Sequence, residues 1–384
     1  MTLQWSAEHQ MFRQTVREFV SSEVAPHMEE WEAGGGFPAH DVFKQMGALG
    51  FLGLEYDPAF GGQGADHTYT VILGEELARV DTMGVAMATG VQTDMATPSL
   101  AQFGSPELKR RYLEPACRGE MVASIAVTEP DAGSDVAAIR TRAVRDGGEY
   151  VLSGTKLYIT NGVQADWLCL LARTSDEGGY QGMSQLVVPT ELAGFSVSRK
   201  LSKLGMRSSD TAELVFDEVR VPVGNIIGVE GRGFQQQMAQ FQNERMIGAY
   251  NSVGAIRDAL QRTRAYLQER RAFGHPLAAN QYIQFRLAEL TARFSMFESY
   301  CHRCAEDSVR GEDTSRQTTI CKLEAGRLIR EVADWCLQFH GGVGYMEETW
   351  TARFYRDARL WSIGGGADEV MLRTLARMDG LDAD

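Results

Sequence analysis

Hydrophobic and polar positions follow two different periods along this chain, and the period changes twice. In residues 8–26 (EHQMFRQTVREFVSSEVAP), apolar side chains recur every three or four positions, which is the spacing of one face of an α-helix. Residues 68–80 and 106–119 repeat this spacing. The pattern predicts an N-terminal α-helical domain over residues 1–120.

Between residues 121 and 230 the apolar positions recur every second residue, as in β-strands. Gly, Asp and Pro separate the short apolar runs, and RDGGEY at 145–150 indicates a hairpin turn. From 231 to 384 the helical spacing returns in long segments with short connections, which is typical of a four-helix bundle. We therefore predict an α+β fold with an N-terminal α-helical domain (1–120), a middle antiparallel β domain (121–230) and a C-terminal four-helix bundle (231–384).

Composition narrows the class of protein without changing this layout. Hydrophobic residues make up 44% and charged residues 23%, which is ordinary for a globular protein. The formal net charge of −13 argues against a nucleic-acid binder, whose surface is usually basic. No segment approaches the ~20 apolar residues of a membrane span, and the N-terminus does not resemble a secretory signal peptide. We expect a cytoplasmic protein with no membrane span and no nucleic-acid partner.

The six cysteines do not predict a metal site. Cys301 and Cys304 form a CxxC in a helical segment, but no second CxxC or spaced histidine pair accompanies them. Reduced, buried thiols in the cytoplasm are the better interpretation.

The usual nucleotide-binding motifs are also missing from the sequence. It has no GxxxxGK[ST], and the clusters GGQG (61–64) and GGVG (341–344) do not open a helix after a strand in a βαβ unit, so a Rossmann site is not predicted. The run ASIAVTEPDAGSD (123–135) instead leaves a strand and enters a loop with several free N–H groups. Such a loop can bind a planar heterocycle or a phosphate-bearing chain, or it can be a simple Pro/Gly/Asp turn. The residues alone leave both interpretations open.

Together with KLYITNG (156–162), ERRAFGHPLAANQ (269–281) and QFHGGVGY (338–345), this run resembles the motifs of the acyl-CoA dehydrogenase family. The four motifs occur in the family's order and in the same α, β, α layout. The resemblance implies an FAD-dependent enzyme that converts an acyl-CoA thioester to the trans-2-enoyl-CoA in fatty acid β-oxidation. It also implies a homotetramer that passes electrons to an electron-transfer flavoprotein.

By motif matching, the resemblance assigns the FAD-binding residues. Arg270 falls on an arginine that meets the FAD pyrophosphate across a subunit boundary, a role that suits its bidentate fork. Without the motif, a surface ion pair with Glu269 would be the simpler interpretation. The implied FAD-binding residues are Val127, Thr128, Gly133, Ser134, Tyr158, Ile159, Thr160, Arg270, Phe273, Gln281, Gln338, Gly341, Gly342 and Asp368.

The reaction needs a carboxylate base, and the resemblance suggests where it lies. A buried carboxylate, whose pKa is raised by desolvation, can remove the weakly acidic α-proton. Many family members carry this glutamate in the C-terminal loop, where this chain has Gly365 in SIGGGADEVM (362–371). Long-chain and isovaleryl subgroups instead place a Glu-Arg pair on a bundle helix, and FQNERMIGAY (241–250) supplies Glu244 and Arg245.

We therefore predict Glu244 as the base, with space beside it at Gly248, one helical turn further on. Gly365 would offer its N–H to the thioester carbonyl, although glycines here could also form only a flexible turn. The implied substrate-binding residues are Ser134, Arg245, Gly365 and Gly366.

The acyl group and the electron acceptor are less constrained by the sequence. A base on a helix and a glycine-rich loop favour long or branched acyl groups, and GGGADEVM also resembles bacterial enzymes for citronellyl-type thioesters. Two alternatives remain: a flavin-dependent oxidase or monooxygenase on the same fold, and a non-enzymatic helical scaffold without cofactor.

Overall fold

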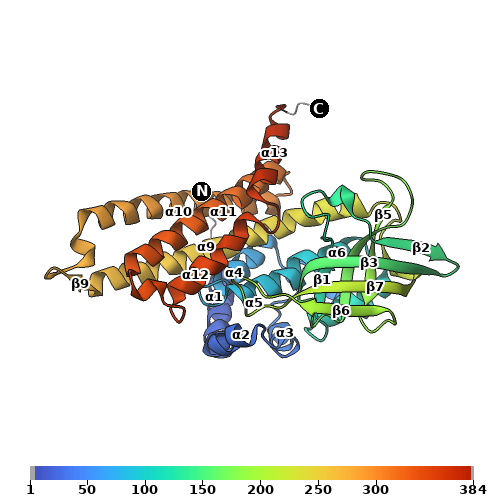
Figure 1. Cartoon of the computed structure of the whole chain (residues 1–384), viewed down its shortest axis with the longest axis horizontal. Helices are drawn as coiled ribbons and strands as arrows, with labels where there is room; N and C mark the ends of the chain where they lie inside the picture. The colour runs from blue at the N-terminus through green and yellow to red at the C-terminus, as the bar shows by residue number, and fades with distance from the viewer. Residues whose placement is uncertain (1–4, 382–384) are drawn as a thin grey trace.

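A computed structural model describes residues 5–381. The β-sheet lies at one end of the molecule, and helices from both ends of the chain pack together beside it (Figure 1). In the N-terminal part, a π-helical turn at Val20–Val24 and a 3₁₀ turn at Ala25–His27 join the first two helices. A second π-helical segment spans Val91–Ala96. The α-helices here are α1 (Ala7–Phe19), α2 (Met28–Gly34), α3 (Ala39–Ala48), α4 (His67–Leu77), α5 (Met83–Gly90), α6 (Pro98–Phe103), α7 (Pro106–Leu108) and α8 (Glu114–Cys117).

The main sheet has the strand order β6-β7-β3-β2-β4-β5-β8, with β1 paired to β4. Its strands are β1 (Ala123–Ala126), β2 (Arg142–Asp146), β3 (Glu149–Thr160), β4 (Trp167–Arg173), β5 (Met183–Pro189), β6 (Phe195–Lys200), β7 (Thr211–Pro222) and β8 (Ile226–Ile227). The predicted hairpin joins β2 to β3 through Gly147, which has φ +61°. Most pairs are antiparallel, but β4 pairs in parallel with β1 and, at one position, with β2. Parallel pairing with β1 is feasible because the β2–β3 hairpin separates the two strands along the chain.

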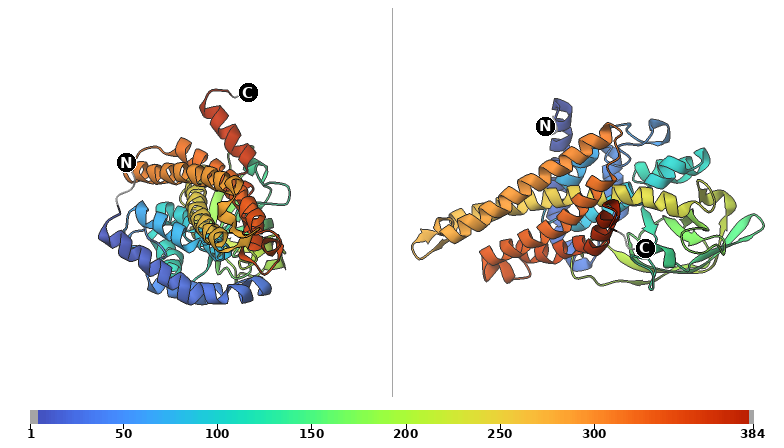
Figure 2. Two further views of the ribbon diagram at one scale, coloured as in Figure 1. Left: turned by 90° about the vertical axis from the view of Figure 1, so that its left-hand side faces the viewer. Right: turned by 90° about the horizontal axis from the view of Figure 1, so that it is seen from above.

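In the described part of the chain, the α-helices after the sheet are α9 (Gly233–Glu269), α10 (Gln281–Val309), α11 (Ser315–His340), α12 (Trp350–Ala358) and α13 (Asp368–Met378). A small hairpin of β9 (Arg271–Ala272) and β10 (His275–Pro276) joins α9 to α10 at the end of the molecule away from the sheet. Figure 2 shows α9 and α10 running side by side towards that end. The predicted α+β fold is confirmed, while the domain limits 1–120, 121–230 and 231–384 stay predictions. Within residues 5–381, no helix has the length and apolarity that a membrane crossing requires.

Small residues let α4 approach α9 closely. A Cβ atom added at Gly74 would lie 2.9 Å from Cβ of Tyr250, and one at Gly254 would lie 2.0 Å from the carbonyl oxygen of Glu75. Neither helix could therefore carry a larger residue at these positions without moving. The position of α9 is fixed relative to the N-terminal helices over this length.

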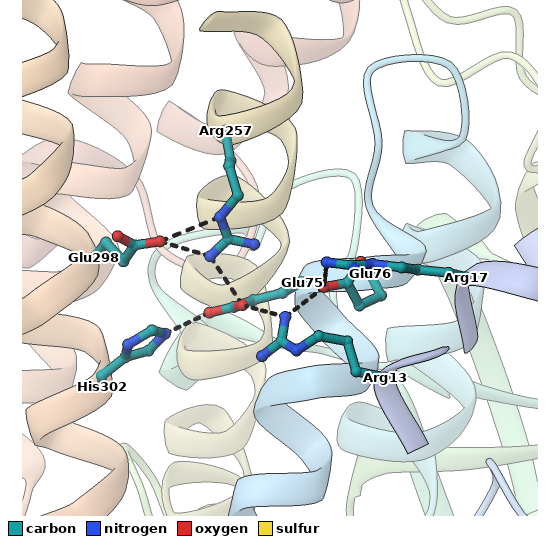
Figure 3. A network of polar contacts seen from close by, with 7 residues as sticks. All are labelled: Arg13, Arg17, Glu75, Glu76, Arg257, Glu298 and His302. Carbon is teal, nitrogen blue, oxygen red and sulfur yellow. Dashed lines mark hydrogen bonds and ion pairs between the residues drawn. The ribbon is translucent and has the colours of Figure 1, made fainter. Parts of the chain in front are cut away.

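A buried ion-pair network reinforces the same contact (Figure 3). Its members are Arg13, Arg17, Glu75, Glu76, Arg257, Glu298 and His302. The Glu75 side chain has no exposed surface, and it accepts from Arg257 at 2.9 Å and from Arg13 at 3.3 Å. Burial alone would raise the pKa of Glu75, but His302 and the arginines lower it to about 2. The network ties α1, α4, α9 and α10 together through one carboxylate.

Candidate active site

Glu244 lies in the first third of α9 and has an unusual environment for a carboxylate. It is partly buried, and within the described chain it makes no hydrogen bond or ion pair. Burial raises its pKa to about 7, although the charges of Arg245 and Lys322 act in the opposite direction. A carboxylate with this pKa and no partner can accept a proton near neutral pH.

The loop that contains the three glycines at 364–366, called the glycine loop below, packs directly against Glu244. A Cβ atom at Gly365 would lie 3.3 Å from Oε1 of Glu244 and 3.2 Å from Cε of Lys322. Gly365 and Gly366 have φ values of +68° and +103°, which side chains disfavour. Close contact and backbone conformation therefore account for both glycines, beyond the flexibility of a turn. Neither backbone N–H finds a backbone acceptor in residues 5–381.

Gly248 does not leave the space that we predicted for a ligand. A Cβ atom there would lie 3.0 Å from Cζ3 of Trp361, whose indole is buried in the main helical core. This glycine instead allows the indole to pack on α9, so the expectation of ligand space at Gly248 was wrong.

Lys322 on α11 is part of this site, and sequence reasoning missed it. It is 1% exposed, and its Nζ donates to the carbonyl oxygens of Trp361 at 2.6 Å and Gly366 at 3.1 Å. Burial lowers its pKa to about 8, while Glu244 and Asp368 act to raise it. A signal was available, since position 322 shares the apolar face of its helix with Ala325 and Ile329.

The predicted cofactor segments 127–134 and 158–160 lie side by side at the sheet. The N–H of Leu157 donates to the carbonyl of Thr128 at 2.9 Å, and the hydroxyl of Ser124 donates to the carbonyl of Thr160 at 2.6 Å. The fully buried Lys156 crosses between the segments, donating to the carbonyl of Val127 and to Glu129, both at 2.8 Å. These contacts hold the loop at one fixed distance from β3.

The predicted cofactor residues in segments 127–134 and 158–160 differ in which of their atoms are exposed to solvent. Gly133 and Ser134 are exposed, and their N–H groups have no backbone acceptor in the described part of the chain. Tyr158 is 66% exposed with φ +62°, a conformation that costs about 1–3 kcal/mol and often marks functional positions. The side chains of Val127 and Ile159 are buried in hydrophobic clusters, so only their backbones can face a cofactor.

The remaining predicted cofactor residues form a second group at the far end of the bundle. Arg270 is the C-cap residue that follows α9; it is exposed and forms no ion pair with Glu269 or with any other described residue. Phe273 is fully exposed at the β9–β10 turn, with φ +52°. Gln281 opens α10. Gln338, Gly341 and Gly342 lie at the end of α11 near α9, where the rings of Tyr266 and His340 stack at 4.0 Å. Figure 1 places this end opposite the sheet.

Asp368 belongs to neither group. It is the first residue of α13, and it faces α11, where Arg330 donates to its Oδ2 at 3.3 Å. A Cβ atom at Gly326 would lie 2.9 Å from its Oδ1, which has no hydrogen-bond partner in the part of the chain described. Asp368 therefore lies behind the glycine loop, next to Lys322 rather than beside the sheet segments.

The cysteines show no sign of metal chemistry or cross-linking. All six are free and buried. Among residues 5–381, no group of three or more His, Cys, Asp or Glu side chains is arranged to bind a metal ion.

Comparison with known proteins matches the whole layout. The sequence profile described as acyl-CoA dehydrogenase, N-terminal domain, matches residues 6–120; the profile of the middle domain matches 124–219; and that of the C-terminal domain matches 231–378.

Similar proteins are known at both the sequence and the structure level. The chain is 35% identical over 375 residues to the mitochondrial long-chain specific acyl-CoA dehydrogenase of Mus musculus, covering 97% of this chain and 86% of that one. It is 34% identical to the mitochondrial isovaleryl-CoA dehydrogenase of Solanum tuberosum, covering 95% and 89%. An acyl-CoA dehydrogenase structure from Geobacillus kaustophilus superimposes with a TM-score of 0.95 at 36% identity, covering 98% and 99%. A glutaryl-CoA dehydrogenase from Mycobacterium smegmatis, solved in complex with FADH2, gives 0.92 at 29% identity, covering 99% and 96%.

Proposed function

The chain belongs to the acyl-CoA dehydrogenase family, and on this premise we propose that Glu244 is its catalytic base. The protein is an FAD-dependent oxidoreductase that acts on the CH–CH bond of acyl-CoA thioesters. The observation that carries the proposal is the position of the unpaired Glu244 carboxylate against the glycine loop. At Gly365, where the resemblance places a glutamate in many family members, an added Cβ atom would lie only 3.3 Å from Glu244 Oε1.

The residues around Glu244 fit the chemistry of α-proton removal. Its carboxylate takes the α-proton, and its raised pKa makes the transfer less unfavourable. The unpaired N–H groups of Gly365 and Gly366 supply donors for the thioester carbonyl, where negative charge develops. Bound FAD supplies the acceptor for the hydrogen and electron pair that leave the β-carbon.

We further propose that each FAD is held by two chains of a homotetramer. The support is that the sheet group (Val127, Thr128, Gly133, Ser134, Tyr158, Ile159 and Thr160) and the far group (Arg270, Phe273, Gln281, Gln338, Gly341 and Gly342) lie at opposite ends of one chain. If a second copy of the chain lies antiparallel to the first, its Arg270 comes to the exposed N–H groups of Gly133 and Ser134 in the first. Exposed apolar side chains near the far group and along α10 and the segment after α11 suit such an interface: Phe273, Tyr282, Phe285, Val343 and Tyr345.

Long or branched acyl groups are the proposed substrates. The support is the helix-borne Glu244 together with the similarity to long-chain and isovaleryl-type relatives. We propose an electron-transfer flavoprotein as the acceptor, because this is the acceptor that the family resemblance implies. A cytoplasmic location also stays a proposal, and six free cysteines are compatible with it.

A panel of straight-chain and branched acyl-CoA thioesters tests this function. Under anaerobic conditions, substrate should bleach the flavin absorbance, most rapidly with long or branched chains. Reoxidation should be slow in air and fast with an electron-transfer flavoprotein or a dye. Hydrogen peroxide formed in stoichiometric amounts at the full turnover rate would indicate the oxidase instead. A colourless protein that cannot be reconstituted with FAD would indicate the scaffold.

A further inference from the structure

The proposed active site contains a buried lysine beside the glycine loop. Lys322 projects from α11 under the 361–366 loop, and its Cε lies 3.2 Å from the Cβ position of Gly365. Burying a lysine is costly unless its donors are satisfied. The Lys322 ammonium donates to two backbone carbonyls rather than to a carboxylate, and within residues 5–381 it forms no ion pair.

We propose that Lys322 is a positioning residue of this active site, which fixes the 361–366 loop and keeps the Glu244 carboxylate ready to accept a proton. This inference rests on the proposed role of Glu244. Lys322 touches neither the reacting carbon nor the thioester in this account, and it acts through the loop and through its charge.

The two hydrogen bonds of Lys322 hold the loop at both ends. One carbonyl belongs to Trp361, before the three glycines, and the other to Gly366, at their end. Glycine runs are mobile unless their peptides are bonded. Because the bonded carbonyls of Trp361 and Gly366 flank the glycine run on both sides, these bonds restrict the conformations of the segment that contains the N–H groups of Gly365 and Gly366.

The charge of Lys322 acts on Glu244 from a different helix. Three charged groups face this region: Arg245 on α9, Lys322 on α11, and Asp368 on α13, which also interacts with Arg330. Burial favours the protonated form of Glu244, whereas Arg245 and Lys322 favour the carboxylate. Without Lys322, Glu244 would hold its proton to a higher pH and would be a worse base at neutral pH.

The test compares Lys322→Gln and Lys322→Arg with wild type. Glutamine keeps an N–H donor for the loop but loses the charge, whereas arginine keeps the charge. The rate of flavin reduction by acyl-CoA is measured against pH, together with the affinity for a 3-thia-acyl-CoA, which binds but is not dehydrogenated. Lys322→Gln should move the acidic limb of the profile upward by about one pH unit, with a much smaller change in affinity. Lys322→Arg should keep the wild-type limb.

Lys203→Gln is the control, because Lys203 is half-buried and, like the fully buried Lys322, donates to a backbone carbonyl, that of Ser209, but it does not interact with Glu244. This variant should leave the acidic limb unchanged. If wild type is bleached but Lys322→Gln has the wild-type limb, the inference is wrong while the proposed function stands. If Lys322→Gln does not fold, an upward-shifted limb in Lys322→Arg would equally overturn it. Wild type that no acyl-CoA bleaches would instead reject the proposed function.

Discussion

Oε1 of Glu244 lies 3.3 Å from the point that a Cβ atom of residue 365 would occupy. The helix position and the loop position therefore face the same small volume from two sides. A glutamate at either position can place its carboxylate in this volume, but two carboxylates there would repel each other and compete for one proton. The glycine at 365 is thus the structural counterpart of the glutamate at 244.

The rate of flavin reduction should depend on pH through Glu244. The base must be ionised, and its pKa is raised to about 7 by burial. The rate should therefore be low below pH 6, rise through about pH 7 and level off above it. Stopped-flow reduction at saturating acyl-CoA measures this profile. An acidic limb near the ordinary glutamate value of about 4.3 would contradict the assignment.

Moving the carboxylate to the loop should restore part of the lost activity. Glu244→Gly should lose most flavin reduction, and adding Gly365→Glu should recover some of it, preferably with shorter, straighter acyl chains. Recovery should be incomplete because residue 365 has φ +68° and its Cβ would lie 3.2 Å from Cε of Lys322. The measurement is the bleaching rate of the single and double variants. Equal bleaching rates for Glu244→Gly and for the double variant would show that a carboxylate at position 365 does not reach the same α-proton.

Arg270→Ala should weaken FAD retention and assembly. An exposed arginine with no ion pair among the described residues of its own chain is available to a neighbouring subunit, and losing a charge-assisted contact typically costs about 2–5 kcal/mol. Flavin content after gel filtration and the oligomer mass measure the effect. Arg110→Ala, on the exposed surface near Phe60, is the control and should change neither. Unchanged flavin and mass in Arg270→Ala would make it a simple surface charge.

Glu75→Gln should destabilise the fold without abolishing the chemistry. It leaves Arg257, Arg13 and His302 without their shared carboxylate (Figure 3), and breaking such a buried group costs about 3–5 kcal/mol. Because the pKa of Glu75 is lowered from 4.5 to about 2, its stabilisation is present above pH 4.5 and lost as pH falls towards 2. Thermal unfolding at pH 7 and pH 3 checks this, and the gap between variant and wild type should narrow at pH 3.

The sequence predicted the layers of the fold and the neighbourhood of the site, but not how side chains share space. The change of period from helix to strand and back is a local signal, and it located the sheet between two helical regions. The role of Gly248 required knowledge of what packs on α9, and that residue, Trp361, lies more than a hundred positions away. The apolar face around position 322 signals that Lys322 is buried, but it does not identify its partners, because these are backbone carbonyls that only folding brings together. The parallel pairing of β4 with β1 likewise depends on long-range topology.

The most direct test of Glu244 as the base is Glu244→Gln, with the exposed Glu107→Gln as a matched control. The amide is nearly isosteric, so FAD content and acyl-CoA binding should remain at wild-type levels. Anaerobic stopped-flow reduction of the flavin by acyl-CoA is the measurement. A general base contributes on the order of 10²–10⁴ in rate, so reduction in Glu244→Gln should slow by at least about 100-fold while Glu107→Gln keeps the wild-type rate. Bleaching of Glu244→Gln at a rate within a few fold of wild type would show that the base lies elsewhere.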